Sequence, residues 1–254
     1  MNFFSAVISF FTLLVCLCTV SVSGQNSITF SRYYGENAAC TATELKNTTS
    51  LVEAVCSYDA NEGLYVKAYC LSASGGLRYQ SYMYTDAACT SLVMASAGSA
   101  NQCVGGNLQV TCSAATTGSV PPSFPTAADG FHLKQSCIAA NTNTCTGSSC
   151  KTEAFLAGTC IPFNTTAPFL TLFGAIYNCD GANNQLIYAG YADNSCTSAN
   201  IQTYVTESLG CNSSYPKFIS RSFTCATTSG NAIINRLNGT FTRVKQFAGT
   251  TCSG

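Results

Sequence analysis

The chain has 254 residues, of which 11 are basic and 11 acidic, so charged residues make up only 9% of it. No stretch concentrates charge of one sign, which excludes the basic patches that bind nucleic acid or anionic membrane surfaces. So little charge leaves solubility to Ser, Thr and Asn side chains, to attached glycan or to burial in an assembly, and we expect an extracellular structural protein.

Residues 1–24 are predicted to be a secretory signal. Residues 1–22 are almost entirely apolar, and Ser23 and Gly24 provide small residues before a cleavage site ahead of Gln25. The apolar run is short for a membrane-spanning helix. Because no Lys or Arg precedes it, an uncleaved anchor is the alternative. After cleavage we expect a secreted or cell-surface protein without a membrane segment.

The cysteines predict a disulfide-rich protein. Removal of Cys16 and Cys18 with the signal would leave fifteen of the 17 cysteines, a density typical of an oxidising compartment. The chain has no C-x-x-C pair and a single histidine, His132, so the spacing of a zinc site is absent. We predict no metal and no other cofactor. Because the remaining number is odd, at least one thiol is free or is bonded to another chain.

A cysteine followed by a hydroxyl residue returns about every fifty residues, which indicates an internal repeat. The copies are Cys40-Thr41, Cys89-Thr90, Cys145-Thr146, Cys196-Thr197 and Cys252-Ser253. In most copies an aromatic residue stands five or six positions earlier, and Asp86 and Asp193 stand three positions before their cysteines. The chain is therefore expected to repeat one structural unit.

Residues 25–113 are predicted to form a first domain. The alternation of polar and apolar residues and the Gly-containing turns predict short strands and no helix. The expected strands are residues 27–33, 51–56, 64–71, 77–84, 92–97 and 108–112. This pattern favours an antiparallel β-sandwich of immunoglobulin-like size, roughly 90 residues. The buried Trp of immunoglobulin domains is missing, since the chain contains none.

Residues 114–130 are predicted to be a linker, because three of the six prolines stiffen this stretch. Residues 131–254 repeat the order of apolar runs and are expected to form a second sandwich with one extra strand. The expected runs are residues 131–138, 154–161, 168–179, 185–191, 201–205 and 218–225. The predicted fold is thus all-β, with two tandem antiparallel β-sandwich domains that arose by internal duplication.

If the domains are copies, their disulfides should repeat. We predict that each motif cysteine pairs with the next cysteine, closing a loop of about 15 residues that contributes on the order of 3 kcal/mol. These pairs are Cys40–Cys56, Cys89–Cys103 and Cys196–Cys211, and the pairs expected across the sheets are Cys70–Cys112 and Cys179–Cys225. Cys160 is expected to bond to Cys145 or Cys150, and the other of these to Cys137. Cys252 is left unpaired or intermolecular.

The end of the chain resembles the first strand of a fifth copy without the rest of that copy. Phe241, Val244 and Phe247 lie in this expected strand. A lone strand cannot satisfy its backbone groups, so it must pair. It can close its own domain as a seventh strand, or add to the sheet of a neighbouring copy in a head-to-tail contact that propagates into a filament.

Four sequons, at Asn47, Asn164, Asn212 and Asn238, are candidate N-glycosylation sites. Chance alone would provide about this number in a chain so rich in Asn, Ser and Thr.

No catalytic constellation is predicted, and we do not expect an enzyme. His132 falls in the polar phase of a strand without a G-x-S-x-G motif, and is interpreted as an exposed strand residue. Asp86 and Asp193 are interpreted as turn-forming residues, with calcium binding as the alternative.

Among the 13 tyrosines, Tyr82 and Tyr84 are candidates for stacking on sugar rings. Core packing is the more frequent use of such residues. A monomeric cell-surface adhesin or carbohydrate-binding module is therefore the alternative function, with extracellular glycans as partners.

The pattern Tyr84-x-Asp86-x-x-Cys89 resembles that of secreted cysteine-rich repeat proteins of amoebae and related protists. The resemblance covers both expected domains and implies use outside the cell, as the protomer of an extracellular fibril. We therefore predict a secreted, glycosylated, disulfide-rich structural protein. Its main partner is expected to be itself, in a head-to-tail filament, coat or matrix.

Overall fold

The computed structural model describes residues 26–34, 39–138, 145–146, 149–167, 170–212, 219–225 and 243–244. Within these ranges the protein consists of seventeen β-strands and three short 3-10 helices, with no α-helix, which confirms the predicted all-β class. The 3-10 helices are Ala42–Glu44, Ala127–Asp129 and Ser198–Asn200. No helix in this part of the chain is long and apolar enough to cross a membrane.

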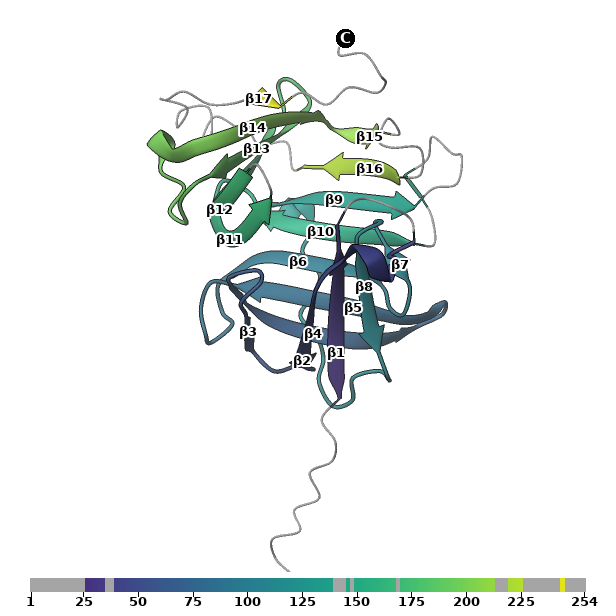
Figure 1. The fold of residues 1–254 in the computed structure, drawn as a ribbon. Helices are drawn as coiled ribbons and strands as arrows, with labels where there is room; N and C mark the ends of the chain where they lie inside the picture. Colours follow the sequence, from purple (N-terminus) through teal and green to yellow (C-terminus); the bar gives the residue numbers. More distant parts are fainter. Residues whose placement is uncertain are drawn as a thin grey trace, which may run out of the picture.

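The described strands form three sheets, which we call the N-terminal, central and C-terminal sheets (Figure 1). The N-terminal sheet has the order β2 (Leu45–Val52), β1 (Ser27–Tyr33), β8 (Leu108–Cys112), β7 (Cys103–Val104). The central sheet has the order β15 (Gly210–Asn212), β16 (Ile219–Thr224), β9 (Phe131–Ile138), β10 (Cys150–Leu156), β6 (Leu92–Ser99), β5 (Gly76–Tyr84), β4 (Leu64–Ala73), β3 (Ser57–Asp59). The C-terminal sheet has the order β11 (Cys160–Ala167), β12 (Leu170–Asp180), β13 (Gln185–Tyr191), β14 (Ile201–Ser208), β17 (Arg243–Val244).

The order of strand pairing repeats between residues 26–112, which we call the first half, and residues 131–225, the second half. The first half contains the runs β2-β1-β8-β7 and β3-β4-β5-β6, and the second half contains β10-β9-β16-β15 and β11-β12-β13-β14. Each strand of the second half carries a number eight higher than its counterpart in the first half. The repeat in the sequence thus corresponds to a repeat in strand order.

The two halves are joined through the central sheet. β10 pairs antiparallel with β6, so that Lys151 lies opposite Gly98 and Phe155 lies opposite Met94. The expected linker, residues 114–130, contains no strand. Phe124 from this stretch packs against a buried cluster on the central sheet. The predicted domains therefore share one sheet, and the expected linker lies against it.

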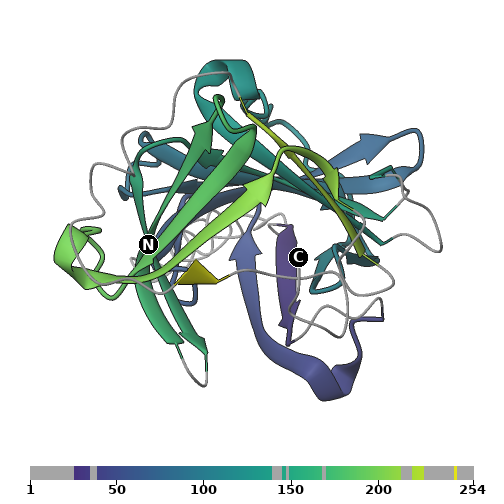
Figure 2. The same cartoon turned by 90° about the horizontal axis from the view of Figure 1, so that it is seen from above.

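The largest core lies between the N-terminal and central sheets. Ile28 and Val110 of the N-terminal sheet meet Leu64 and Tyr79 of the central sheet, and all four side chains are buried. Ile161, near the start of the C-terminal sheet, belongs to the same cluster. Both outer sheets thus pack on one face of the central sheet, as the view from above shows (Figure 2).

Seven disulfides link the described residues. They are Cys40–Cys103, Cys56–Cys89, Cys70–Cys112, Cys137–Cys150, Cys145–Cys211, Cys160–Cys196 and Cys179–Cys225. Three repeat between the halves: sequence separations of 63, 33 and 42 in the first half become 66, 36 and 46 in the second. The expectation that pairings repeat is therefore met.

The individual pairings agree with the sequence prediction only in part. Cys70–Cys112 and Cys179–Cys225 are present as expected, and Cys137–Cys150 is one of the alternatives that had been left open. The predicted short-loop pairs Cys40–Cys56, Cys89–Cys103 and Cys196–Cys211 were wrong, as was a bond from Cys160 to Cys145 or Cys150. The wrong pairs were chosen because they close short loops. Loop length affects only the entropy of the unfolded chain, whereas strand pairing in the folded protein brings cysteines together that are more distant in the sequence.

Candidate functional site

The repeated motif forms the corner between β5 and β6. The Asp86 carboxylate accepts hydrogen bonds from the backbone N–H groups of Ala88, Thr90 and Ser91, at 3.0, 3.2 and 2.6 Å. The Thr90 hydroxyl donates a further bond at 3.1 Å. One side chain thereby satisfies three backbone donors of the turn, while the Cys89 N–H donates to the Asp86 backbone carbonyl.

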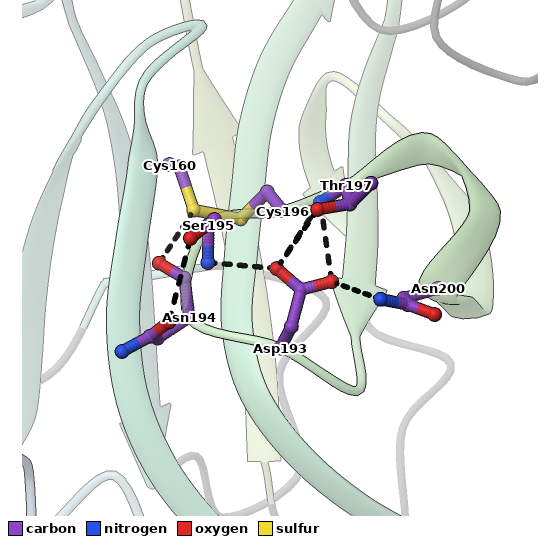
Figure 3. Close-up of a disulfide and its surroundings, with 7 residues drawn as sticks. All are labelled: Cys160, Asp193, Asn194, Ser195, Cys196, Thr197 and Asn200. Atoms are coloured by element: carbon purple, nitrogen blue, oxygen red, sulfur yellow. Dashed lines mark hydrogen bonds between the residues drawn. A yellow bond between two sulfur atoms is a disulfide. The ribbon is translucent and has the colours of Figure 1, made fainter.

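The same corner returns between β13 and β14, where Asp193 takes the place of Asp86 (Figure 3). Its carboxylate accepts bonds from the backbone N–H groups of Ser195 at 2.8 Å and Thr197 at 3.2 Å. The Asn200 side-chain amide donates another at 2.8 Å. The corner is thus a repeated device with the same central residue.

Hydrogen bonding favours the ionised form of both aspartates. For Asp86, the backbone hydrogen bond from Ser91 has the largest effect and lowers the pKa of the carboxyl group. For Asp193, partial burial acts to raise the pKa, but the bonds from Asn200, Thr197 and Ser195 outweigh it and lower the pKa. N–H and O–H donors surround these carboxylates, which supports the turn-forming interpretation over calcium binding.

A disulfide holds each corner to a neighbouring strand. The corner cysteines, Cys89 and Cys196, have left-handed backbone conformations with φ of 52° and 51°. Cys89 bonds to Cys56, just before β3, and Cys196 bonds to Cys160, at the start of β11. β12 passes so close to the second corner that a Cβ on Gly174 would lie 2.6 Å from the Asp193 carbonyl oxygen. The corners are therefore structural staples.

Sheet edges are the surfaces at which a further strand can pair. In the first half, β10 occupies the outer edge of β6 along Met94–Gly98. The counterpart of β6 in the second half is β14. In the part of the chain that the structure describes after residue 225, Arg243 and Val244 of β17 pair with its outer edge, in parallel, opposite Tyr204 and Val205. Among the described residues, the rest of this edge has no strand beside it.

The C-terminal strand predicted around Phe241, Val244 and Phe247 is described only in part. Val244 lies in β17, which pairs with β14 of the same chain. This agrees with the first alternative, in which the strand closes its own domain. Phe241, Phe247 and Cys252 lie outside the described residues.

The second open edge belongs to β2. It pairs with β1 along its length, and no described strand pairs with its other side. β2 carries one exposed charge, Lys46, near its start. Residues Asn47–Leu51 read Asn-Thr-Thr-Ser-Leu, without the charges or proline that protect natural edge strands from addition. Thr48 and Ser50 are exposed on this strand. The edge beyond Lys46 therefore has no such protection.

The sequence prediction missed most of β2, because the expected run was residues 51–56. Polar residues at successive positions hide the alternation of a half-buried strand. The β-branched Thr48 and Thr49 were the signal that could have revealed it.

Charged side chains cluster where the two halves meet. Glu153 of β10 pairs with Lys151 at 2.9 Å and Lys134 at 3.3 Å. Burial acts to raise the pKa of Glu153, but the two lysines outweigh it and lower the pKa to about 2. Arg32 and Glu62, paired at 2.7 Å, line the same cavity of about 220 Å³. These opposite charges pair with one another, so we interpret the cluster as part of the contact between the two halves and not as a binding site.

His132 is buried, which corrects the prediction of an exposed strand residue. Its ring centroid lies 4.8 Å from that of Phe155 and 4.9 Å from that of Tyr177, and these two rings also stack on each other at 4.1 Å. Burial lowers the pKa of His132 to about 3, so the imidazole is neutral at physiological pH. The His132 side chain points from β9 toward the C-terminal sheet. We therefore interpret His132 as a residue of the core.

Tyr82 and Tyr84 are also buried, which corrects the proposed glycan-stacking role. They are 0% and 5% exposed and pack with Tyr69 and Phe131 on the central sheet. The Tyr82 hydroxyl donates to the carbonyl of Pro122 in the expected linker. The linker covers the face on which these rings lie, so they cannot stack on a sugar in this conformation.

The candidate glycosylation sites lie in different settings. Asn47 is half-buried in β2, and its side-chain oxygen accepts a hydrogen bond from Arg32 at 3.5 Å. Asn164 lies in β11 and Asn212 ends β15, while Asn238 is outside the described residues. Glycan attachment at these sites stays a prediction.

Comparison with known proteins gives no relative from which a role could be transferred. No protein-family model matches the chain, no curated protein matches it, and no solved structure matches it.

Proposed function

We propose that the protein is a secreted, glycosylated structural protein that assembles head-to-tail into an extracellular filament, coat or matrix. The observation that carries the proposal is the unequal use of one edge. β10 fills this edge in the first half, whereas among the described residues only the two-residue β17 lies beside it in the second half. Unpaired N–H and C=O groups along an edge are a template for strand addition from another chain.

Each half is proposed to be a β-sandwich, and the two halves to derive from an internal duplication. The repeated strand order and the three repeated disulfides support this origin. The shared core of the N-terminal and central sheets supports the sandwich.

The two edges that described strands leave open or nearly open belong to different strands, β2 and β14, which lie in the lower and upper parts of Figure 1. A contact between unlike surfaces is heterologous. Heterologous contacts generate rings when the rotation closes and open filaments when it does not. Polymers are therefore the expected product of strand addition.

Seven disulfides are typical of proteins that mature in an oxidising compartment. They support secretion, as does the apolar N-terminus that was interpreted as a signal. Only 9% of the residues are charged, so the surface of a single chain has little charge to keep it in solution. Burial of part of that surface in an assembly would reduce this need.

The test is expression of the full chain in a eukaryotic secretory host. The expected product begins at Gln25, forms oligomers whose mass grows with concentration in light scattering, and appears as fibres or sheets in negative-stain microscopy. A monodisperse monomer at the highest attainable concentration under oxidising conditions would contradict the proposal.

The alternative, a monomeric adhesin or carbohydrate-binding module, depended on Tyr82 and Tyr84. Because both side chains are buried, the described surface offers no specific support for it.

A further inference from the structure

We propose that β2 of a second copy of this chain occupies the outer edge of β14, in the register that β10 adopts on β6. This inference rests on the proposed head-to-tail assembly and names the two strands that form its joint. The junction inside the chain serves as the template for the junction between chains.

The first step is the correspondence of β2 and β10. Both are the second strand in the repeated order, and both lie beside the first strand of their half. In the first half, Thr111, just before Cys112, lies opposite Thr29, and Thr29 lies opposite Ser50.

In the second half, Thr224, just before Cys225, lies opposite Leu133, and Leu133 lies opposite Ala154. The disulfides of these two cysteines are equivalent. Cys112, at the end of β8, bonds to Cys70 of β4, and Cys225, directly after β16, bonds to Cys179 of β12. Ser50 of β2 therefore corresponds to Ala154 of β10.

The second step is the correspondence of β6 and β14, which an irregularity in strand pairing fixes independently. The register of β5 with β6 shifts beyond the pair Met83 and Met94. The register of β13 with β14 shifts in the same way beyond the pair Gly190 and Thr203. Met94 therefore corresponds to Thr203.

Together these correspondences transfer the register of the internal junction to the joint between chains. Ala154 lies opposite Ala95, and Phe155 opposite Met94. The joint then pairs Asn47 with Glu207, Thr48 with Thr206, Thr49 with Val205, Ser50 with Tyr204 and Leu51 with Thr203.

This joint would complete the sheets. The central sheet consists of four strands from each half, in the order β15-β16-β9-β10-β6-β5-β4-β3. Joining β2 of one copy to β14 of another gives the order β7-β8-β1-β2-β14-β13-β12-β11, which is the same sequence of equivalent strands. The N-terminal and C-terminal sheets are thus the two unjoined parts of one eight-stranded sheet.

β17 lies where the joint would form, because it pairs with Tyr204 and Val205. The incoming β2 would replace this two-residue parallel pairing by a longer antiparallel ladder like that of β10 on β6. Antiparallel pairing is slightly more stable per residue than parallel pairing. β17 therefore acts as a weak cap that the next copy displaces.

Cysteine cross-linking in the full chain tests the joint. Residues directly opposite on antiparallel strands have Cα atoms about 4.5–5.5 Å apart, within the range of a disulfide. Thr48→Cys protein mixed with Thr206→Cys protein should yield a disulfide-linked mixed dimer on mild oxidation. Peptide mapping should find residue 48 joined to residue 206. A chain that carries both substitutions should give a ladder of covalent oligomers.

The matched control replaces Thr48→Cys by Thr29→Cys, on the neighbouring strand β1. Because Thr29 lies opposite Ser50, it would be one strand spacing and two residues farther from residue 206, roughly 12 Å away, beyond disulfide reach. Either variant alone should give no mixed species. Equal cross-linking of the control, or fibres without the link between residues 48 and 206, would overturn this joint while leaving the assembly standing. A monomer without cross-links would overturn both.

A second variant separates β2 from the terminal strand as the donor. Arg243→Pro with Val244→Pro removes both backbone N–H groups of β17. If β2 is the incoming strand, this full-length variant should assemble at a lower concentration than the unsubstituted chain. Loss of assembly in this variant would show that the terminal segment is itself the donated strand, and would overturn the inference.

Discussion

The two halves share a strand order and three disulfides, yet they differ in what lies beside the strand that follows the corner. In the first half, β10 covers β6 along Met94–Gly98, and in the second half the described residues place only β17 beside β14, at Tyr204 and Val205. Within the described part of the chain, this edge is thus filled in one half and covered by two residues in the other. If the proposed assembly forms, the filled edge of the first half is the template for the contact between chains.

The strongest way to challenge the equivalence of the halves is to remove their matching disulfides. The double substitutions Cys70→Ala/Cys112→Ala and Cys179→Ala/Cys225→Ala open loops with sequence separations of 42 and 46. Each should lower the free energy of unfolding by about 4 kcal/mol, because loops of similar length restrict the unfolded chain to a similar degree. Urea unfolding of both variants measures this, and clearly unequal losses would contradict the equivalence.

Glu153 sharpens the comparison, because its counterpart in the first half is the uncharged Thr49. Glu153→Gln would leave Lys134 and Lys151 without their partner at the junction. We expect the free energy of unfolding to fall by about 3 kcal/mol at neutral pH. Thr49→Val, the matched change, removes hydrogen bonds from Arg32 and Asn61 and one to Asp59, and should cost about 2 kcal/mol.

The effect of Glu153→Gln should depend on pH. Because the folded-state pKa of Glu153 is lowered to about 2 from 4.5, its stabilisation is complete above pH 4.5 and is lost as the pH falls toward 2. Unfolding curves at several pH values should therefore converge for the two proteins under acid conditions. A difference that persists at pH 2 would show that the ion pairs are not its source.

Gly174 tests the packing of the second corner. It lies opposite Tyr191, the last residue of β13, whereas the equivalent position in the first half, opposite Tyr84 of β5, is occupied by Tyr65. Gly174→Ala would place a Cβ 2.6 Å from the Asp193 carbonyl oxygen, so strands must shift. The expected loss is about 2 kcal/mol. Gly75→Ala is the control, because its Cβ would meet no atom within 4 Å. Equal losses would exclude the close approach as the cause.

The smallest effect is expected at the aspartates of the corners. Asp86→Ala and Asp193→Ala should each lower the unfolding temperature slightly and to a similar extent, since both carboxylates accept bonds from their turn. Hydrogen bonding lowers both pKa values, so this contribution is present above the ordinary pKa of Asp and is lost on acidification. Calcium-dependent stability of the unsubstituted protein would contradict the turn-forming role.

Local patterns were sufficient to predict most strands and the corners. Residues 64–71 and 77–84 alternate clearly and form β4 and β5. The recurrence of Cys70 and Cys112 at corresponding strand positions in the second half also allowed two disulfides to be predicted.

Apart from the missed part of β2, the main errors come from contacts between distant parts of the chain. Cys40 bonds to Cys103 rather than to the nearer Cys56, because strand pairing brings the beginning and end of the first half together. Tyr82 is buried because the stretch after β8 folds back over it. The pairing of β6 with β10 has no local signal, so the joined sheet could not be read from periodicity.

The distribution of the disulfides determines how the chain would respond to mechanical tension. Each of the seven joins two cysteines of the same half, and none crosses from one half to the other. Under a pulling force, covalent bridges would limit extension inside each half. Residues 113–136, between Cys112 and Cys137, carry no bridge and would lengthen first, once β10 had separated from β6. If the proposed fibre forms, it would therefore stretch at its junctions and keep its halves intact.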